Sequence, residues 1–204
     1  FMFKIVTKFS IVIVCHSRLF DPKKSHEITP SRLNNIWIKN CNLPNLDKPR
    51  LLYVGRINPE KGIDNFINIF NKMNTDSELF IAGNTEKLKG TDHKIKSLGY
   101  ISSEQELVRT YDHCNITILP SYTEGYPMVV LESLSRHRPI IIFKEIEHIV
   151  EDRKGIFVSN RNYQSLYEKI NYIIDNYNSI QESMKLNKLP DNESFINKLK
   201  EILS

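Results

Sequence analysis

Residues 115–139 read NITILPSYTEGYPMVVLESLSRHRP, and this stretch decides the fold. Its apolar run Ile116–Leu119 predicts a buried strand, which Pro120 stops because proline has no backbone N–H to give to a sheet. A tight loop around Glu124 follows. Pro127 fixes φ and lacks a donor, which favours the first turn of a helix. The order strand, loop, helix predicts a corner at which parallel sheets bind ligands.

The loop and the predicted helix carry one glycine and two acids that can border a single pocket. Gly125 permits a ligand to approach the backbone or allows a positive φ, and the free N–H groups at the helix start are donors for an anion or a sugar hydroxyl. Glu132 lies on the second turn and leans toward the helix N-terminus. The alternative is that Glu124 is an ordinary carboxylate near a helix dipole and Glu132 a solvated helix residue. Spacing alone favours this ordinary interpretation, because paired acids are common on helices.

Residues 51–62, LLYVGRINPEKG, predict a second corner of the same kind. A strand ends at Gly55 and Arg56, and a helix begins near Gly62 after a turn. A guanidinium that grips phosphate with two hydrogen bonds, beside the mobile ammonium of Lys61, matches the charge and shape of a diphosphate. Taken alone, an arginine and a lysine in a loop are more often solvated surface charges.

Together the two stretches resemble the donor-binding half of the family 4 glycosyltransferases, which are retaining enzymes of the GT-B fold. The matching residues are Val54, Gly55, Arg56, Lys61, Gly62, Pro120, Glu124, Gly125, Pro127, Leu131 and Glu132. Glu124 and Glu132 are the two acids of the family's Glu-x7-Glu signature. The resemblance extends in order over roughly residues 36–180, so a chance match is a poor explanation.

The resemblance implies a role for each matching residue. The implied catalytic residues are Arg56 and Lys61, which hold the donor diphosphate and stabilise the leaving group, and Glu124, which contacts the donor sugar. Glu132 is expected to bind the ribose hydroxyls. The full implied donor-binding set is Gly55, Arg56, Lys61, Gly83, Ile101, Glu124, Gly125, Tyr126, Pro127 and Glu132. The implied donor is a UDP- or GDP-sugar, with no cofactor and no metal, because fixed cations and helix N–H groups supply the charge stabilisation.

Two members of this set have alternative interpretations. Gly83 follows the apolar run Leu79 to Ala82, and it can line the cleft or simply end a strand. At Ile101 the backbone, rather than the side chain, is expected to contact the base.

The neighbouring residues Asp112, His113 and Cys114 resemble a set of metal ligands, but adjacent residues at a helix end cannot all face one ion.

The alternation of predicted strands and helices indicates an α/β fold. We expect a doubly wound, Rossmann-like and mainly parallel sheet with helices on both faces, forming one half of a GT-B fold. Residues 36–38 are expected to form its first strand and residues 100–101 a later one. Residues 1–35 are interpreted as a remnant of an N-terminal domain or a linker, and residues 36–204 as the donor-binding domain with C-terminal helices.

Composition is consistent with this fold but does not select a function. The chain has 204 residues, 40% of them hydrophobic, a formal net charge of +4 and a pI near 8.8. Such mild basicity favours nucleotide-sugars, anionic lipid or nucleic acid equally. Cys15, Cys41 and Cys114 form no CxxC pair, so we interpret them as small buried hydrophobes in a reduced, cytoplasmic compartment.

Two stretches depart from the family pattern. Arg136, His137 and Arg138 replace a small glycine turn, so the preceding helix must end without glycine, with His137 in a strained conformation. Residues 144–148, KEIEH, replace a stretch that tends to be glycine-rich. Their side chains would narrow the sugar pocket or mark a chain that is drifting from catalysis.

Three functions therefore stay open at this stage. The preferred one is a glycosyltransferase of the hexosyl type, whose acceptor half comes from a longer chain, a partner subunit or a homo-oligomer, with peripheral contact at the cytoplasmic face of a membrane. The second is a non-catalytic nucleotide-sugar-binding module or subunit. The third is a basic nucleic-acid-binding protein, which no aromatic-plus-basic motif supports.

Overall fold

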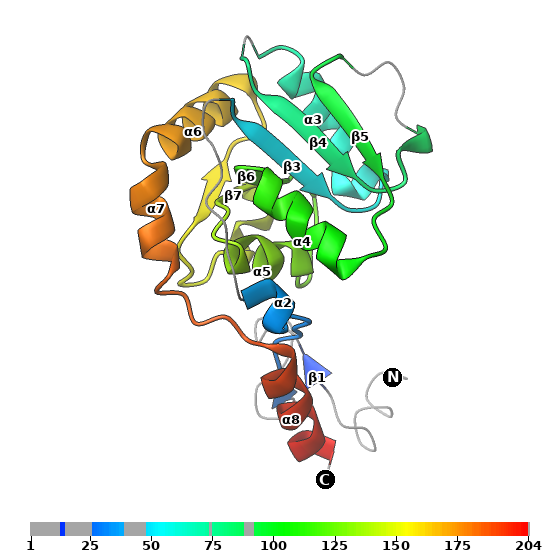
Figure 1. Cartoon of the computed structure of the whole chain (residues 1–204), viewed down its shortest axis with the longest axis vertical. Coiled ribbons are helices and arrows are strands. Elements are labelled where there is room, and N and C mark those ends of the chain that lie inside the picture. Colours follow the sequence, from blue (N-terminus) through cyan, green and yellow to red (C-terminus); the bar gives the residue numbers. More distant parts are fainter. Residues whose placement is uncertain (1–12, 15–25, 39–47, 74, 88–91, 204) are drawn as a thin grey trace, which may run out of the picture.

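The computed structural model describes residues 13–14, 26–38, 48–73, 75–87 and 92–203, and its centre is a six-stranded parallel sheet (Figure 1). The strands run in the order β5-β4-β3-β6-β7-β8. Their bounds are β3 Arg50–Val54, β4 Glu78–Ala82, β5 Ile95–Gly99, β6 Ile116–Leu119, β7 Ile140–Phe143 and β8 Ile156–Ser159. A separate parallel pair joins β1 (Ile13–Val14) to β2 (His26–Glu27).

The central strands form because their sequences are apolar on both sides. Every residue of β6 and β7 is buried, as expected for a parallel sheet covered on both faces. The edge strand β5 is different, since Ile95 is buried while Lys96, Ser97 and Leu98 are exposed. The predicted strand at residues 116–119 is confirmed to the residue.

Helices cover both faces of the sheet, as predicted. The α-helices are α2 Asn35–Ile38, α3 Ile63–Phe70, α4 Glu104–His113, α5 Met128–Ser135, α6 Tyr163–Asp175, α7 Tyr177–Met184 and α8 Asn192–Leu203. The 3-10 helices are η2 Pro59–Lys61, η3 Thr85–Lys87 and η4 Lys144–Ile149. Phe66 of α3 and Ile170 of α6 pack in one apolar cluster, and Trp37 of α2 and Tyr111 of α4 pack in the other. The doubly wound parallel fold is therefore confirmed.

The strand order reverses between β3 and β6, and this reversal positions the site. Strands on one side of it run β3, β4, β5, and on the other side β6, β7, β8. In such sheets the connections leave the carboxyl ends of the two central strands in opposite directions, which opens a crevice between them. The loops that meet there are residues 55–62 after β3 and residues 120–127 after β6.

Two predicted strands were wrong. Residues 36–38 lie in the short helix α2, where Asn34 caps the turn by accepting a bond from the Ile36 N–H at 2.8 Å. Residues 100–101 follow β5 instead of forming a strand, because the chain turns at Gly99, where φ is +68°.

Two helix ends and one cysteine show how local sequence sets local structure. At the start of α4, the Ser103 hydroxyl accepts a hydrogen bond from the Glu106 N–H at 3.3 Å. Helix α5 ends without glycine, and His137 has a φ of 49°. Cys114 is buried, whereas Cys15 and Cys41 lie outside the described residues. The boundary at residues 35/36 stays a prediction.

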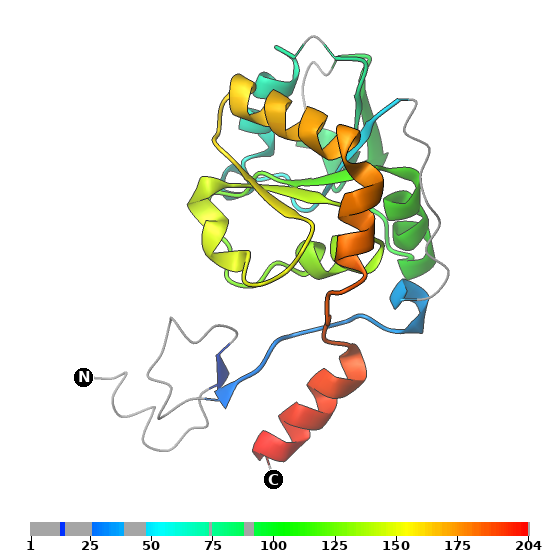
Figure 2. The same ribbon diagram turned by 90° about the vertical axis from the view of Figure 1, so that its left-hand side faces the viewer.

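The C-terminal helix α8 stands apart from the sheet. Figure 1 and Figure 2 both show it projecting away from the layers formed by the sheet and the other helices. It contains no buried residue. Within the described ranges, no helix combines the length and the apolar character required to cross a bilayer.

Candidate functional site

The two loops at the reversal of strand order are bound to each other. The Tyr122 N–H donates to the carbonyl oxygen of Glu60 at 2.9 Å, which joins the loop after β6 to the turn after β3. Gly62, with a φ of +66°, lies so close to this loop that a Cβ there would be 2.2 Å from the carbonyl oxygen of Pro120. Only glycine allows both the left-handed conformation and the close approach. The two sequence corners therefore form one site.

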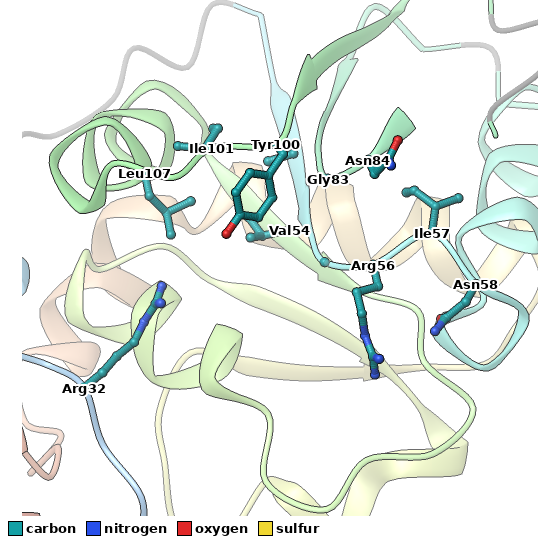
Figure 3. A pocket seen from close by; sticks show the side chains of 12 residues that line it. Arg32, Val54, Arg56, Ile57, Asn58, Gly83, Asn84, Tyr100, Ile101 and Leu107 are labelled. Carbon is teal, nitrogen blue, oxygen red and sulfur yellow. The ribbon is translucent and has the colours of Figure 1, made fainter. Parts of the chain in front are cut away.

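A cleft of about 490 Å³ opens beside the β3 corner (Figure 3). Its volume lies in the range of pockets that hold ligands of nucleotide size. Its walls are Arg32, Val54, Gly55, Arg56, Ile57, Asn58, Ala82, Gly83, Asn84, Tyr100, Ile101 and Leu107. Four residues of the predicted donor-binding set, namely Gly55, Arg56, Gly83 and Ile101, are thus brought together on one cleft.

Gly55 and Gly83 are glycines for a packing reason. A Cβ on Gly83 would lie 2.2 Å from the carbonyl oxygen of Gly55, and a Cβ on Gly55 would lie 3.0 Å from the hydroxyl of Tyr53. The backbones after β3 and β4 therefore touch at the floor of the cleft. Arg56, in contrast, is exposed, and its side chain extends from the ribbon at the side of the cleft where Asn58 lies (Figure 3).

Lys61 and Glu124 form an ion pair that joins the two loops. Lys61 Nζ lies 2.6 Å from Glu124 Oε1, and the Ser121 hydroxyl donates to the same oxygen at 2.6 Å. Both side chains are largely shielded, with exposed fractions of 21% and 9%. Neither residue is one of the cleft walls, whereas Arg56 of the same turn is. Charge pairing across a partly dehydrated contact fixes the relative position of the two loops.

Glu132 is buried inside α5 and is not a solvated helix residue. Its Oε2 accepts a bond from the Tyr111 hydroxyl at 2.9 Å, and its Oε1 lies 2.6 Å from Nη2 of Arg32. Burial raises the pKa of the Glu132 carboxyl above its ordinary value, and the Arg32 charge acts in the opposite direction. Burial, together with the nearby Glu132, also raises the pKa of the Tyr111 phenol well above its ordinary value. Glu132 is not itself a wall of the cleft, but its partner Arg32 is.

The residues Gly125, Tyr126 and Pro127 surround a different hollow. A Cβ on Gly125 would meet nothing within 4 Å, and its φ is not positive, so neither close packing nor a left-handed backbone requires glycine at this position. The Tyr126 hydroxyl accepts a bond from Arg153 Nη2 at 2.7 Å. The hollow has a volume of about 10 Å³, far too small for a sugar ring. Pro127 is the N-cap residue of α5, one position before the predicted first turn.

The remaining acids and cations near the loops have structural partners. Asp112 accepts two bonds from Arg136, at 2.9 Å and 2.8 Å, so it serves the packing of α4 against the turn after α5. In η4, His148 lies with a ring nitrogen 3.2 Å from the carbonyl oxygen of Glu124. No group of three metal-ligating side chains gathers anywhere in the part of the chain that the structure describes.

Sequence reasoning missed several walls of the cleft, and Arg32 is the most important. Arg32 comes from a segment that the sequence indicated as a linker, and no local motif marks it. Asn58 lies inside the recognised Gly55–Gly62 stretch, and Tyr100 directly precedes Ile101. These two could have been included by taking every residue that follows a parallel strand, whereas Leu107 comes from inside α4.

Comparison with known proteins agrees with this geometry. Residues 37–188 match the family "Glycosyl transferases group 1". An uncharacterized glycosyltransferase of Haemophilus influenzae is 27% identical over 167 residues, which are 76% of this chain and 47% of that protein. The N,N'-diacetylbacillosaminyl-diphospho-undecaprenol alpha-1,3-N-acetylgalactosaminyltransferase of Campylobacter jejuni is 25% identical over 77% of this chain and 42% of its own length.

A solved structure shows the same fold. The Anabaena protein HepE, crystallised in complex with UDP, superposes with a TM-score of 0.76 at 15% identity, over 98% of this chain and 65% of HepE. This chain spans about half the length of the curated relatives that it matches. Its parallel sheet and paired loops are thus those of one half of a GT-B protein. The chain belongs to the group 1 glycosyltransferase family.

Proposed function

We propose that this chain is the donor-binding half of a family 4 glycosyltransferase that transfers a hexose from a nucleoside-diphosphate sugar to an acceptor with retention. The observation that carries the proposal is the convergence of Arg56 and the Lys61–Glu124 pair at the reversal of strand order, next to a cleft of about 490 Å³. These groups come from two loops far apart in the sequence. Their meeting is what a site for an anionic sugar donor requires.

The charges of these groups fit a diphosphate leaving group. The Lys61 ammonium has three N–H donors and uses one of them in the hydrogen bond to Glu124. The other two can point at phosphate oxygens. The Arg56 guanidinium can hold a second phosphate with paired hydrogen bonds. Fixed cations that face the developing negative charge lower the barrier to breaking the sugar–phosphate bond.

Glu124 is proposed to contact the donor sugar. Among the described residues, both hydrogen-bond contacts of its carboxylate are made to Oε1, so Oε2 has room to accept a sugar hydroxyl. We assign no enzymatic nucleophile. Retention is proposed to follow from attack on the face that the leaving group departs from, with Glu132 assigned to the ribose instead.

UDP is the first nucleotide to test, with GDP second. HepE was solved with UDP and with UDP-glucose. Its identity to this chain, 15% and 14% in the two structures, supports a common fold, and its ligand is the reason to test UDP before GDP. The apolar walls Val54, Ile101 and Leu107 provide a surface on which a base can lie.

The acceptor half is proposed to come from a longer chain, a partner subunit or a homo-oligomer. The chain covers 47% and 42% of the two relatives above, which leaves room in those proteins for a second domain. We also propose a cytoplasmic location with peripheral contact to a membrane. No cofactor or metal is required for the chemistry proposed for Arg56 and Lys61.

A non-catalytic donor-binding module is the second candidate. It is favoured by η4, where KEIEH replaces a stretch that tends to be glycine-rich in similar proteins and places the His148 ring 3.2 Å from the Glu124 carbonyl oxygen. Side chains at this point reduce the space for a sugar next to Glu124. The two candidates agree on donor binding and differ only in turnover.

Calorimetric titration with UDP, GDP and their glucose and N-acetylglucosamine conjugates tests the proposal. Arg56→Ala and Lys61→Ala should each weaken nucleotide binding about tenfold or more, because each removes a charge-assisted hydrogen bond worth about 1.5–3 kcal/mol. Lys72→Ala removes an exposed ammonium just after α3 and should change nothing. A folded chain that binds no nucleotide, or variants that bind as well as the wild type, would refute donor binding.

Turnover separates the two candidates. A transferase should release sugar from the bound donor to water or to an added acceptor, and proton NMR of the first product gives its anomeric configuration. The same configuration as the donor supports retention, and the opposite one refutes it. Binding without any turnover, even after a complementary domain is added, favours the module.

A further inference from the structure

An ion pair joins the segment before the sheet to the buried acid of α5. Nη2 of Arg32 lies 2.6 Å from Oε1 of Glu132, and the exposed fractions of the two side chains are 50% and 3%. The Arg32 guanidinium also lies 5.5 Å from the centre of the Trp37 ring. Arg32 is a wall of the cleft (Figure 3), and its guanidinium also contacts a carboxylate that solvent barely reaches.

The segment that carries Arg32 is firmly attached to the domain. The Asn192 N–H donates to the Leu33 carbonyl oxygen at 2.8 Å. The side chains of Asn34 and Trp37 both donate to the carboxylate of Glu104 on α4, at 3.0 Å and 2.8 Å. Leu33 and Trp37 are fully buried. Arg32 is therefore held beside the cleft by contacts to α4 and to the start of α8, and its position does not depend on Glu132 alone.

Arg32 favours the charged form of Glu132, against the effect of burial. The groups that act on its carboxylate are the Arg32 guanidinium, the neutral Tyr111 hydroxyl and the repulsive Glu104 carboxylate. A buried carboxylate that loses its ion-pair partner takes up a proton, because an unpaired buried charge is costly. A protonated carboxyl has an O–H of its own and one oxygen fewer that can accept strongly. It would bind two ribose hydroxyls poorly.

We propose that Arg32 is a positioning residue for the nucleotide: its guanidinium, itself a wall of the cleft, holds the adjoining Glu132 carboxylate charged and oriented, so that the carboxylate can accept the donor's ribose hydroxyls. This inference rests on the proposed function and deepens it. Arg32 acts through Glu132, not by gripping phosphate as Arg56 does. The segment before the sheet thereby becomes part of the donor site.

The test measures the Kd for UDP and for GDP between about pH 5 and about pH 8 in the wild type, Arg32→Ala and Arg32→Lys. In Arg32→Ala the proton stays on Glu132 to a higher pH. The ratio of the variant Kd to the wild-type Kd should therefore rise as the pH falls, by up to about tenfold per pH unit, and approach a constant at high pH. Using the ratio cancels the titration of the nucleotide itself. Arg32→Lys keeps the charge and should restore most of the wild-type profile.

Arg109→Ala is the matched control, because it removes an exposed guanidinium from α4 without touching the cleft walls. Its Kd ratio should stay near one across the pH range. The double variant Arg32→Ala with Glu132→Gln should bind the nucleotide no more weakly than Glu132→Gln alone. In the Glu132→Gln background there is no carboxylate charge for Arg32 to stabilise.

Three results would overturn the inference. The first is a Kd ratio for Arg32→Ala that does not depend on pH, and the second is tighter binding by that variant, which would show that Arg32 blocks Glu132. The third is a further loss in the Glu132→Gln background, which would place Arg32 directly on the ligand. In each case the wild type still binds nucleotide, so the proposed function stands. If the folded wild type binds neither UDP nor GDP, the proposed function fails first.

Discussion

Replacing Gly62 by alanine tests how closely the two loops of the site are packed. Gly62 has a φ of +66° and a ψ of 11°, a left-handed conformation that costs an L-residue about 1–2 kcal/mol. A Cβ there would lie 2.2 Å from the carbonyl oxygen of Pro120. This oxygen cannot move away freely, because Arg161 Nη1 donates to it at 2.9 Å. Forcing a methyl group into packed space costs about 1–3 kcal/mol more. We expect Gly62→Ala to lower the free energy of unfolding by about 2–5 kcal/mol.

Gly99→Ala is the matched control for the backbone cost alone. Gly99 has a φ of +68°, and a Cβ there would meet nothing within 4 Å. Gly99→Ala should therefore lower the free energy of unfolding by only about 1–2 kcal/mol. Unfolding in urea measures the free energy of unfolding of both variants. The transition is followed by the fluorescence of Trp37, which is the single tryptophan and is fully buried. Equal losses in the two variants would show that the loops are not in close contact, and the reasoning would be refuted.

Two further predictions concern buried groups outside the cleft. Burial raises the pKa of the Cys114 thiol to about 12, so iodoacetamide at about pH 8 should leave it unmodified in the folded chain and alkylate it in urea. Peptide mass spectrometry reads this out, and labelling of folded Cys114 would contradict it. Arg136→Ala removes the two hydrogen bonds to Asp112 and one to the Trp37 carbonyl oxygen, and should cost about 3–5 kcal/mol of stability. A loss below about 1 kcal/mol in urea unfolding would contradict that estimate.

Predictions from local pattern succeeded where the pattern was strong. Residues 116–119 are apolar except for Thr117 and stopped by proline, and they form β6. Gly62 precedes a helix whose apolar residues recur at helical spacing, and α3 begins at the next residue. Residues 36–38 are apolar too, but three residues are too few to distinguish a strand from a helix. Packing of Trp37 against Tyr111, at 5.6 Å between ring centres, accompanies the helical form.

The candidate site was predicted in its parts and not in its arrangement. The sequence indicated Arg56, Lys61, Glu124 and Glu132 as one set. The structure places Arg56 on the cleft, pairs Lys61 with Glu124 outside the cleft walls, and buries Glu132 against Arg32. The reason is that side-chain pairing depends on distances across the sheet, which spacing along the chain does not contain.

The sequence by itself determined the parallel α/β fold, the two loops that carry the site and the family to which the chain is similar. These depend on hydrophobic period, on proline and glycine positions and on short motifs, all of which are local along the chain. Only the tertiary structure decided that Arg32 pairs with Glu132 and that Tyr126 turns toward Arg153 instead of the cleft wall. These partners lie 100 and 27 positions apart along the chain, and they meet because the sheet brings distant segments together, so no local pattern records which side chains meet.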